Sequence, residues 1–174
     1  MRHRSQAHWL LLASLFMITP ATAPSAAEIG VRAGASLGDA GFNSQEIYWR
    51  TPLPGRLGDP RGWNATSRLE LNAARLAAAG DSMVTAGGNV GVWAGSPRSP
   101  VGFGLGTGPT YISQTSLGGR DFGSNWQFTS WATAQLRVDR NLFIGYRVQH
   151  TSNAGLSSPN QGYNLQALEA HVRF

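Results

Sequence analysis

The chain has 174 residues, no cysteine and a formal charge of +5, which comes from 14 arginines and 9 acidic residues. A length of this order predicts one domain. The lack of cysteine excludes disulfides and thiolate chemistry, and so modest an excess of positive charge does not favour a nucleic-acid partner.

The first 27 residues have the layout of a secretory signal peptide. Arg2–Arg4 form a basic start, Trp9–Ile18 are mainly apolar, and Ser25–Ala27 are small residues suited to cleavage. The apolar run is too short for a membrane-spanning helix. We therefore expect residues 1–27 to be removed, which lowers the formal charge to +3 and leaves residues 28–174 as one barrel domain.

The remaining sequence predicts strands throughout. Seven clusters of Gly, Pro, Asn, Asp and Ser interrupt it, and such clusters are typical of turns. The segment from Leu69 to Ala79 is the one ambiguous run, because Ala and Leu favour a helix locally. The turns separate eight predicted strands, at residues 29–37, 43–51, 63–78, 83–94, 101–114, 122–137, 142–153 and 162–174.

Alternation along these strands predicts two different faces. In 142–153 the even positions are apolar as far as Val148, whereas the odd positions include Arg147 and Gln149. In 122–137 the even face includes Phe122 and Trp126, and in 101–114 four glycines form a bare face that would suit a crowded interior. A soluble β-sandwich also alternates, with its apolar face inward, so it remains the alternative.

Three features favour a membrane barrel over a soluble sandwich. The predicted signal peptide would export the chain. The last predicted strand ends on Phe174, and aromatic residues lie near predicted strand ends. The predicted fold is all-β, an eight-stranded antiparallel transmembrane β-barrel in the outer membrane of a Gram-negative cell, with side chains filling its interior. The aromatic residues are Trp49, Trp63, Trp93, Tyr111, Trp126 and Tyr146.

His150 and Ser152 are candidates for catalysis. Residues i and i+2 of a strand share a face, so the imidazole and the hydroxyl can lie side by side. A histidine beside a serine is the smallest nucleophile–base pair for acyl transfer. Both positions continue the apolar, lipid-facing side of their strand, and Asn164 and Gln166 do so in the next strand. The alternative interpretation is that these residues merely lie above the hydrocarbon zone, near a loop.

The segment HTSNAGLSSPNQG, residues 150–162, resembles the signature of the lipid A 3-O-deacylases, outer-membrane enzymes that trim lipopolysaccharide. Upstream, VGFGLGTG (101–108), Trp126–Phe128 and Gly145–Arg147 follow the family's order. The resemblance is good over 101–174 and loose before it. It implies an eight-stranded barrel with an ester-hydrolysing site on the lipid-facing surface and lipid A as the substrate.

By the same resemblance, Ser152 would be the nucleophile and His150 its general base. Asn153 would help to form the oxyanion hole through its side chain or neighbouring backbone N–H groups. Gly155 and Gly162 would supply turn conformations between the last two strands. No cofactor or metal is implied, and a homodimer is left open.

One position departs from the family's pattern. Two residues after the glycine that closes the signature the family has a glutamate, and this chain has Asn164. An amide can orient an imidazole but cannot stabilise its cation by charge. Glu169 is expected to point into the barrel. A non-catalytic or weakened barrel that binds lipopolysaccharide is therefore the alternative function.

Overall fold

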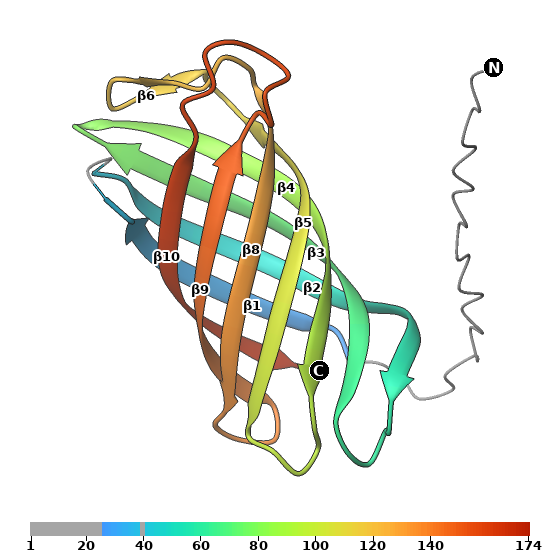
Figure 1. Ribbon diagram of the computed structural model, residues 1–174. Helices are drawn as coiled ribbons and strands as arrows, with labels where there is room; N and C mark the ends of the chain where they lie inside the picture. The colour runs from blue at the N-terminus through green and yellow to red at the C-terminus, as the bar shows by residue number, and fades with distance from the viewer. Residues whose placement is uncertain (1–25, 39–40) are drawn as a thin grey trace, which may run out of the picture.

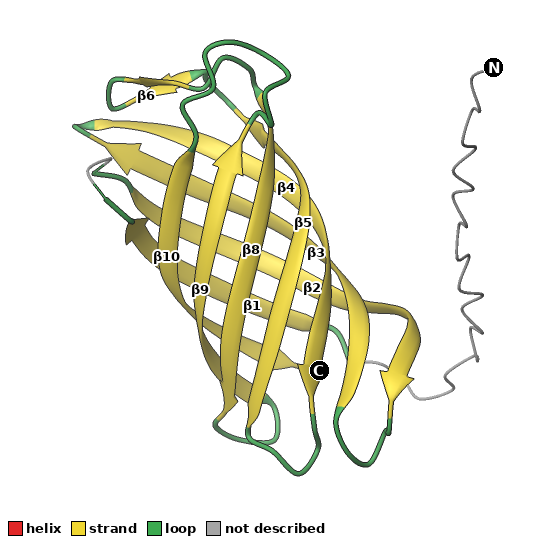
Figure 2. Ribbon diagram, viewed as in Figure 1, coloured by secondary structure: helices red, strands yellow, loops and turns green. Residues whose placement is uncertain are grey.

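The computed structural model describes residues 26–38 and 41–174, and within them it contains ten strands and no helix (Figure 2). No helix suited to crossing a membrane occurs in this part of the chain. Residues 1–25 of the predicted signal peptide and positions 39 and 40 lie outside the described residues. The strands are β1 Glu28–Ser36, β2 Asn43–Gly58, β3 Asn64–Ala78, β4 Asp81–Gly95, β5 Val101–Ile112, β6 Ser116–Leu117, β7 Arg120–Asp121, β8 Trp126–Arg137, β9 Leu142–Ser152 and β10 Tyr163–Arg173.

Eight of these strands close into an antiparallel barrel in the order β1-β10-β9-β8-β5-β4-β3-β2, and β6 and β7 form a small separate hairpin (Figure 1). The predicted fold class is confirmed. The barrel closes because the first strand, β1, pairs with the last, β10. This pairing runs from Glu28↔Arg173 to Ser36↔Leu165. A closed barrel leaves no strand edge unpaired, so every strand can cross a bilayer.

The second predicted strand was too short. The sequence places a break from Pro52 to Gly62, but β2 continues to Gly58. The register against β3 shifts between Pro52 and Arg56, and this bulge absorbs the residues that would otherwise disrupt the ladder. The ambiguous run from Leu69 is part of β3, since pairing on both sides overrides its local helix preference.

The predicted faces hold in β9 and β10, but two aromatic side chains elsewhere point the other way. Trp93 was expected near the membrane surface, and Phe122 on the outer face; both are buried. Phe122 lies before β8 begins, so the parity of that strand does not apply to it. Trp93 packs inside against Trp131, with ring centroids 4.8 Å apart.

The bare glycine face of β5 makes room for these tryptophans. A Cβ atom on Gly104 would lie 2.7 Å from Nε1 of Trp93, and one on Gly106 would lie 2.5 Å from Cζ2 of Trp131. Such distances are below van der Waals contact, so any larger residue would displace an indole ring. The glycines therefore allow the interior to be filled rather than hollow, as predicted.

A network of buried ion pairs fills the middle of the barrel. Glu70 is fully buried and receives hydrogen bonds from Arg32 (2.7 Å), Arg50 (2.9 Å) and Arg147 (2.9 Å). Arg32 also pairs with Glu46 and Glu169, and Arg50 with Glu28. Arg32 and Arg147 therefore join strands that are distant in sequence, and charged side chains occupy the interior at this level.

Replacing Glu70 by glutamine is expected to lower the free energy of unfolding by about 3–5 kcal/mol, because three buried guanidinium groups lose their shared carboxylate. Urea unfolding in phosphatidylcholine vesicles measures this. Asp59→Asn, which removes the same charge from an exposed turn, is expected to change stability by less than about 0.5 kcal/mol. If the two substitutions lower the free energy of unfolding equally, the buried ion pairs of Glu70 do not stabilise the barrel.

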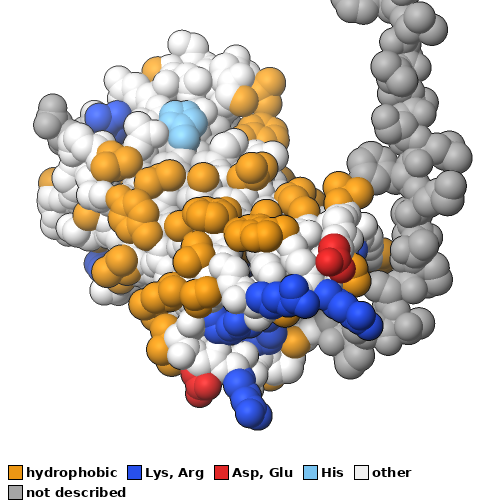
Figure 3. Space-filling model, turned by 60° about the horizontal axis from the view of Figure 1, so that its bottom comes forward, with side chains coloured by type: hydrophobic (Ala, Val, Ile, Leu, Met, Phe, Trp, Pro, Cys, Tyr) orange, Lys and Arg blue, Asp and Glu red, His pale blue; other side chains and the backbone are white. Residues whose placement is uncertain are grey.

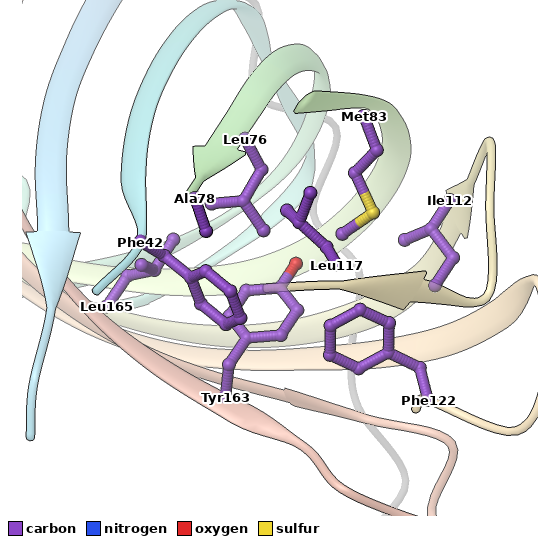
Figure 4. Packing of buried hydrophobic residues seen from close by; sticks show 9 residues of the cluster. All are labelled: Phe42, Leu76, Ala78, Met83, Ile112, Leu117, Phe122, Tyr163 and Leu165. Carbon is purple, nitrogen blue, oxygen red and sulfur yellow. The ribbon is translucent and has the colours of Figure 1, made fainter. Parts of the chain in front are cut away.

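An apolar cluster closes one end of the barrel (Figure 4). The rings of Phe42, Phe122 and Tyr163 pack edge-on or tilted, with centroids 5.6–6.3 Å apart. They come from the β1–β2 loop, the β5–β8 connection and β10, so the cluster ties the long loops to the barrel wall. Its members are Phe42, Leu76, Ala78, Met83, Ile112, Leu117, Phe122, Tyr163 and Leu165.

The two ends of the barrel differ in loop length. The upper end in Figure 1 has the long connections 113–125 and 153–162, and the lower end has the turns 59–63, 96–100 and 138–141 together with the C-terminus. Outer-membrane barrels have long extracellular loops and short periplasmic turns. The upper end is therefore the extracellular one.

Candidate active site

A row of polar side chains runs across the outer surface near the extracellular end. Thr107, Ser130, His150 and Asn164 occupy directly paired positions on β5, β8, β9 and β10, and all four are exposed. One paired position further toward the periplasmic end, the outward residues include Leu105, Ala132 and Val148. Toward the extracellular end, the exposed aromatic residues Phe128, Tyr111 and Trp126 follow, so the row lies between the aliphatic surface and an aromatic border. Figure 3 shows apolar side chains spread in a band over the face of the barrel turned toward the viewer.

His150 and Asn164 are hydrogen-bonded across this row. The distance between His150 Nδ1 and Asn164 Oδ1 is 2.8 Å. An amide oxygen only accepts, so Nδ1 carries the proton and Nε2 keeps its lone pair. This is the tautomer that a general base needs. The structure thus brings together the histidine and the residue in the family's acid position.

Ser152 lies on the same strand and the same outer side as His150, and it is partly buried. Both side chains lie against Gly162. A Cβ atom on Gly162 would be 2.8 Å from Ser152 Cβ and 3.1 Å from His150 Cε1. The hydroxyl and the imidazole are close but not hydrogen-bonded to each other here, and catalytic hydrogen bonds often tighten only when substrate binds.

Gly162 was expected to provide a turn conformation, but its φ is not positive; Gly155, with a φ of 78°, does adopt one. At Gly162 the requirement is space, because a methyl group would also lie 2.7 Å from the carbonyl oxygen of Thr151. Sequence reasoning missed this contact, since it depends on how β10 begins opposite the end of β9.

Asn153 is buried in the β9–β10 loop rather than facing the lipid. Its side-chain nitrogen donates to the backbone oxygens of Phe122 (2.9 Å), Ser157 (3.0 Å) and Pro159 (3.1 Å). Its Oδ1 accepts from Gly155 N (2.9 Å). The Asn153 side chain therefore holds the loop together, and none of its polar atoms faces outward.

The backbone N–H groups just after Ser152 differ in whether they have an acceptor. Asn153 N donates to Asn160 Oδ1 (3.1 Å), and Gly155 N is taken by Asn153. Within the described chain, no group accepts a hydrogen bond from Ala154 N. Ala154 has a φ of 55°, which is uncommon for a residue with a side chain and is imposed by the surrounding contacts.

The β5–β8 connection clamps this loop from outside. Asp121 N donates to Gln161 Oε1 (2.8 Å), and Arg120 donates to the carbonyl oxygen of Gly162 (3.1 Å). Both donors belong to β7, and both acceptors lie just before β10. The end of the loop that leads into β10 is thus fixed to β7. Sequence reasoning identified no role for this connection.

Comparison with known proteins identifies the family. A family model described as lipid A 3-O-deacylase (PagL) matches residues 43–173. The chain belongs to the lipid A 3-O-deacylase family. The match covers seven of the eight barrel strands and includes His150, Ser152 and Asn164. As a member of this family of outer-membrane esterases, it is a lipid A 3-O-deacylase. No curated protein sequence matches the chain.

Solved structures support the fold of this deacylase-family barrel. The crystal structure of the outer membrane enzyme PagL is 17% identical, with a TM-score of 0.75, over 84% of this chain and 99% of that one. The N-terminal β-barrel domain of Pseudomonas aeruginosa OprF is 12% identical, with a TM-score of 0.58, over 86% and 98%. The Yersinia pestis protein Ail is 12% identical, with a TM-score of 0.51, over 86% and 99%. At these identities the likeness concerns the fold.

Substituting alanine for Gly162 is expected to lower deacylase turnover about tenfold, because the added methyl displaces Ser152 and His150 from each other. Initial rates on lipid A measure this. Gly88→Ala is the matched control, since its Cβ would meet only Leu71 Cδ2, at 3.5 Å. If both variants keep the wild-type rate, the close approach at Gly162 has no catalytic role.

Proposed function

We propose that this deacylase hydrolyses the 3-O ester of lipid A with Ser152 as nucleophile and His150 as general base. The observation that carries the proposal is the His150–Asn164 hydrogen bond of 2.8 Å, which places the proton of the neutral imidazole on Nδ1 and so leaves the lone pair of Nε2 free to act as a base. All three residues come from the last two strands of one chain. The chemistry therefore needs no second copy of the protein.

In the proposed reaction Ser152 Oγ attacks the ester carbonyl carbon while His150 Nε2 takes the hydroxyl proton. The tetrahedral intermediate then releases the sugar 3-oxygen, which receives that proton from the imidazole. Water, deprotonated by the same nitrogen, hydrolyses the acyl-serine and frees the fatty acid. Asn164 keeps the ring in the productive tautomer throughout, although it adds no negative charge.

For the oxyanion we propose the backbone N–H of Ala154, with Asn153 as the residue that positions it. The Ala154 N–H has no acceptor among residues 26–38 and 41–174, whereas the Asn153 side chain is fully engaged in the loop. A donor fixed in place before reaction stabilises developing negative charge without reorganising, and such a donor contributes about a hundred- to a thousandfold in rate.

The position of the site suits an ester of a membrane lipid. The polar row that contains His150 and Asn164 lies just below the aromatic residues Tyr111 and Trp126 that border the apolar surface at the extracellular side. The ester bonds of a lipid lie at the same boundary between head group and hydrocarbon. Lipid A embedded in the outer leaflet would therefore present its ester at the height of Ser152 while its acyl chains lie against the apolar band.

The test is deacylation of purified lipid A by the refolded full-length protein in detergent, followed by mass spectrometry. The expected product has lost one ester-linked acyl chain, and the released fatty acid appears in equal amount. Unchanged lipid A after long incubation at high protein concentration would instead support the alternative, a barrel that binds lipopolysaccharide without turnover. The observation behind that alternative is the uncharged Asn164.

A further inference from the structure

An arginine-lined cavity opens at the periplasmic end of the barrel, far from Ser152. Its volume is about 320 Å³, which equals that of roughly ten liquid water molecules. Four guanidinium groups line it, from Arg56, Arg68, Arg137 and Arg173. Figure 3, which turns the lower end of the barrel forward, shows arginine side chains gathered below the apolar band.

The charge in this cavity is not balanced by the protein. Among the described residues no carboxylate lines it. Glu28, just inside, accepts from Arg68 (2.6 Å) and Arg173 (2.7 Å), but it also accepts from Arg50 (2.9 Å). One carboxylate therefore serves three guanidinium groups, and neither Arg56 nor Arg137 has an acidic partner within the described chain.

Three of the four guanidinium groups that line the cavity are held in place by neighbouring groups. The Nε atom of Arg68 is buried and has no hydrogen-bond acceptor among the described residues. The guanidinium of Arg173 lies 4.4 Å from the ring centroid of Phe143, and that of Arg68 lies 5.4 Å from Trp93. Arg137 is anchored by the carbonyl oxygen of Pro97 (2.8 Å). Fixed planar donors of this kind suit an oxyanion.

We propose that this cavity binds a phosphate group from the periplasmic side, either the head-group phosphate of a phospholipid or free inorganic phosphate. Three or four guanidinium groups around one opening would neutralise its charge, and the ligand oxygens would accept hydrogen bonds from the guanidinium N–H groups that line the cavity. The site lies at the opposite end from the ester-hydrolysing residues. Its ligand would link the β2–β3 and β4–β5 turns to β8 and β10, and so stabilise the lower rim.

The first experiment is calorimetric titration of the refolded full chain in maltoside detergent with inorganic phosphate. The variant Arg56→Gln/Arg137→Gln is expected to bind at least tenfold more weakly than wild type. The matched control is Arg140→Gln, which removes a charge from the same end but outside the cavity, and it is expected to stay within about twofold. Circular dichroism melting verifies that each variant is folded.

A second arm distinguishes the two sources of phosphate. Phosphatidylglycerol and diacylglycerol, which lacks the phosphate, are each added to the detergent micelles. Binding of phosphatidylglycerol that disappears in Arg56→Gln/Arg137→Gln assigns the site to a lipid head group, and binding of inorganic phosphate alone assigns it to the free anion. If neither probe binds wild type more tightly than the double variant, or if Arg140→Gln weakens binding equally, the proposal is wrong.

Discussion

Replacing Ser152 by alanine is expected to lower lipid A deacylation by roughly 10⁴- to 10⁶-fold, because the nucleophile is removed while the imidazole and the loop donors remain. The barrel should be unaffected, since Ser152 forms no side-chain hydrogen bond with the rest of the described chain. Mass-spectrometric initial rates give the activity, and thermal melting gives the stability.

Ser130→Ala is the matched control for this experiment. Ser130 presents a hydroxyl on the same outer surface, directly opposite His150 on the neighbouring strand, and bonds to Thr107 Oγ1 at 3.0 Å. Its loss is expected to change turnover less than about tenfold, because it only borders the reacting groups. A Ser152→Ala protein as active as wild type would remove Ser152 from the mechanism. If only Ser130→Ala loses activity, Ser130 and not Ser152 is the nucleophile.

Substituting aspartate for Asn164 is expected to raise turnover roughly ten- to a hundredfold. The side chains have the same shape, so the 2.8 Å contact with His150 Nδ1 is kept and only a negative charge is added. In serine proteases the reverse change costs about 10⁴, largely because the amide selects the wrong tautomer. Here the amide oxygen already faces Nδ1, so the tautomer is correct. The aspartate would therefore add only the electrostatic stabilisation of the imidazolium, and the expected gain in rate is smaller than about 10⁴.

Two further variants at this position complete the experiment. Asn164→Glu installs the residue that the family pattern has there and is expected to raise turnover as well, whereas Asn164→Leu removes the acceptor and is expected to lower it. The pH dependence of kcat/KM is measured alongside for each variant. No change in rate in any of the three would show that position 164 has no catalytic role.

Strand periodicity was enough to predict the barrel and the outward direction of His150 and Ser152. The apolar even positions of β9 fix which face meets lipid, and both residues follow that parity. Periodicity failed where side chains leave the regular ladder. Pro52 did not end β2 because a bulge absorbs it, and Phe122 turned inward because the strand had not yet begun.

The local structure of the site was less accessible to sequence reasoning. The pairing of His150 with Asn164 depends on the register of β9 against β10, which only the resemblance to the family suggested. The side-chain amide of Asn153 could donate a hydrogen bond to an oxyanion, yet four carbonyl and hydroxyl oxygens surround its nitrogen. One of these oxygens, that of Phe122, comes from the β5–β8 connection 31 positions away in sequence, so no local pattern could reveal the full environment.

The filled interior has a consequence for kinetics. Because ion pairs and an apolar cluster occupy the barrel, substrate and product cannot travel through it and must arrive and leave by lateral diffusion. The rate should then depend on the mole fraction of lipid A within the bilayer or micelle rather than on its bulk molarity. Diluting lipid A with inert phospholipid at constant total lipid A should slow the enzyme, whereas adding buffer should not.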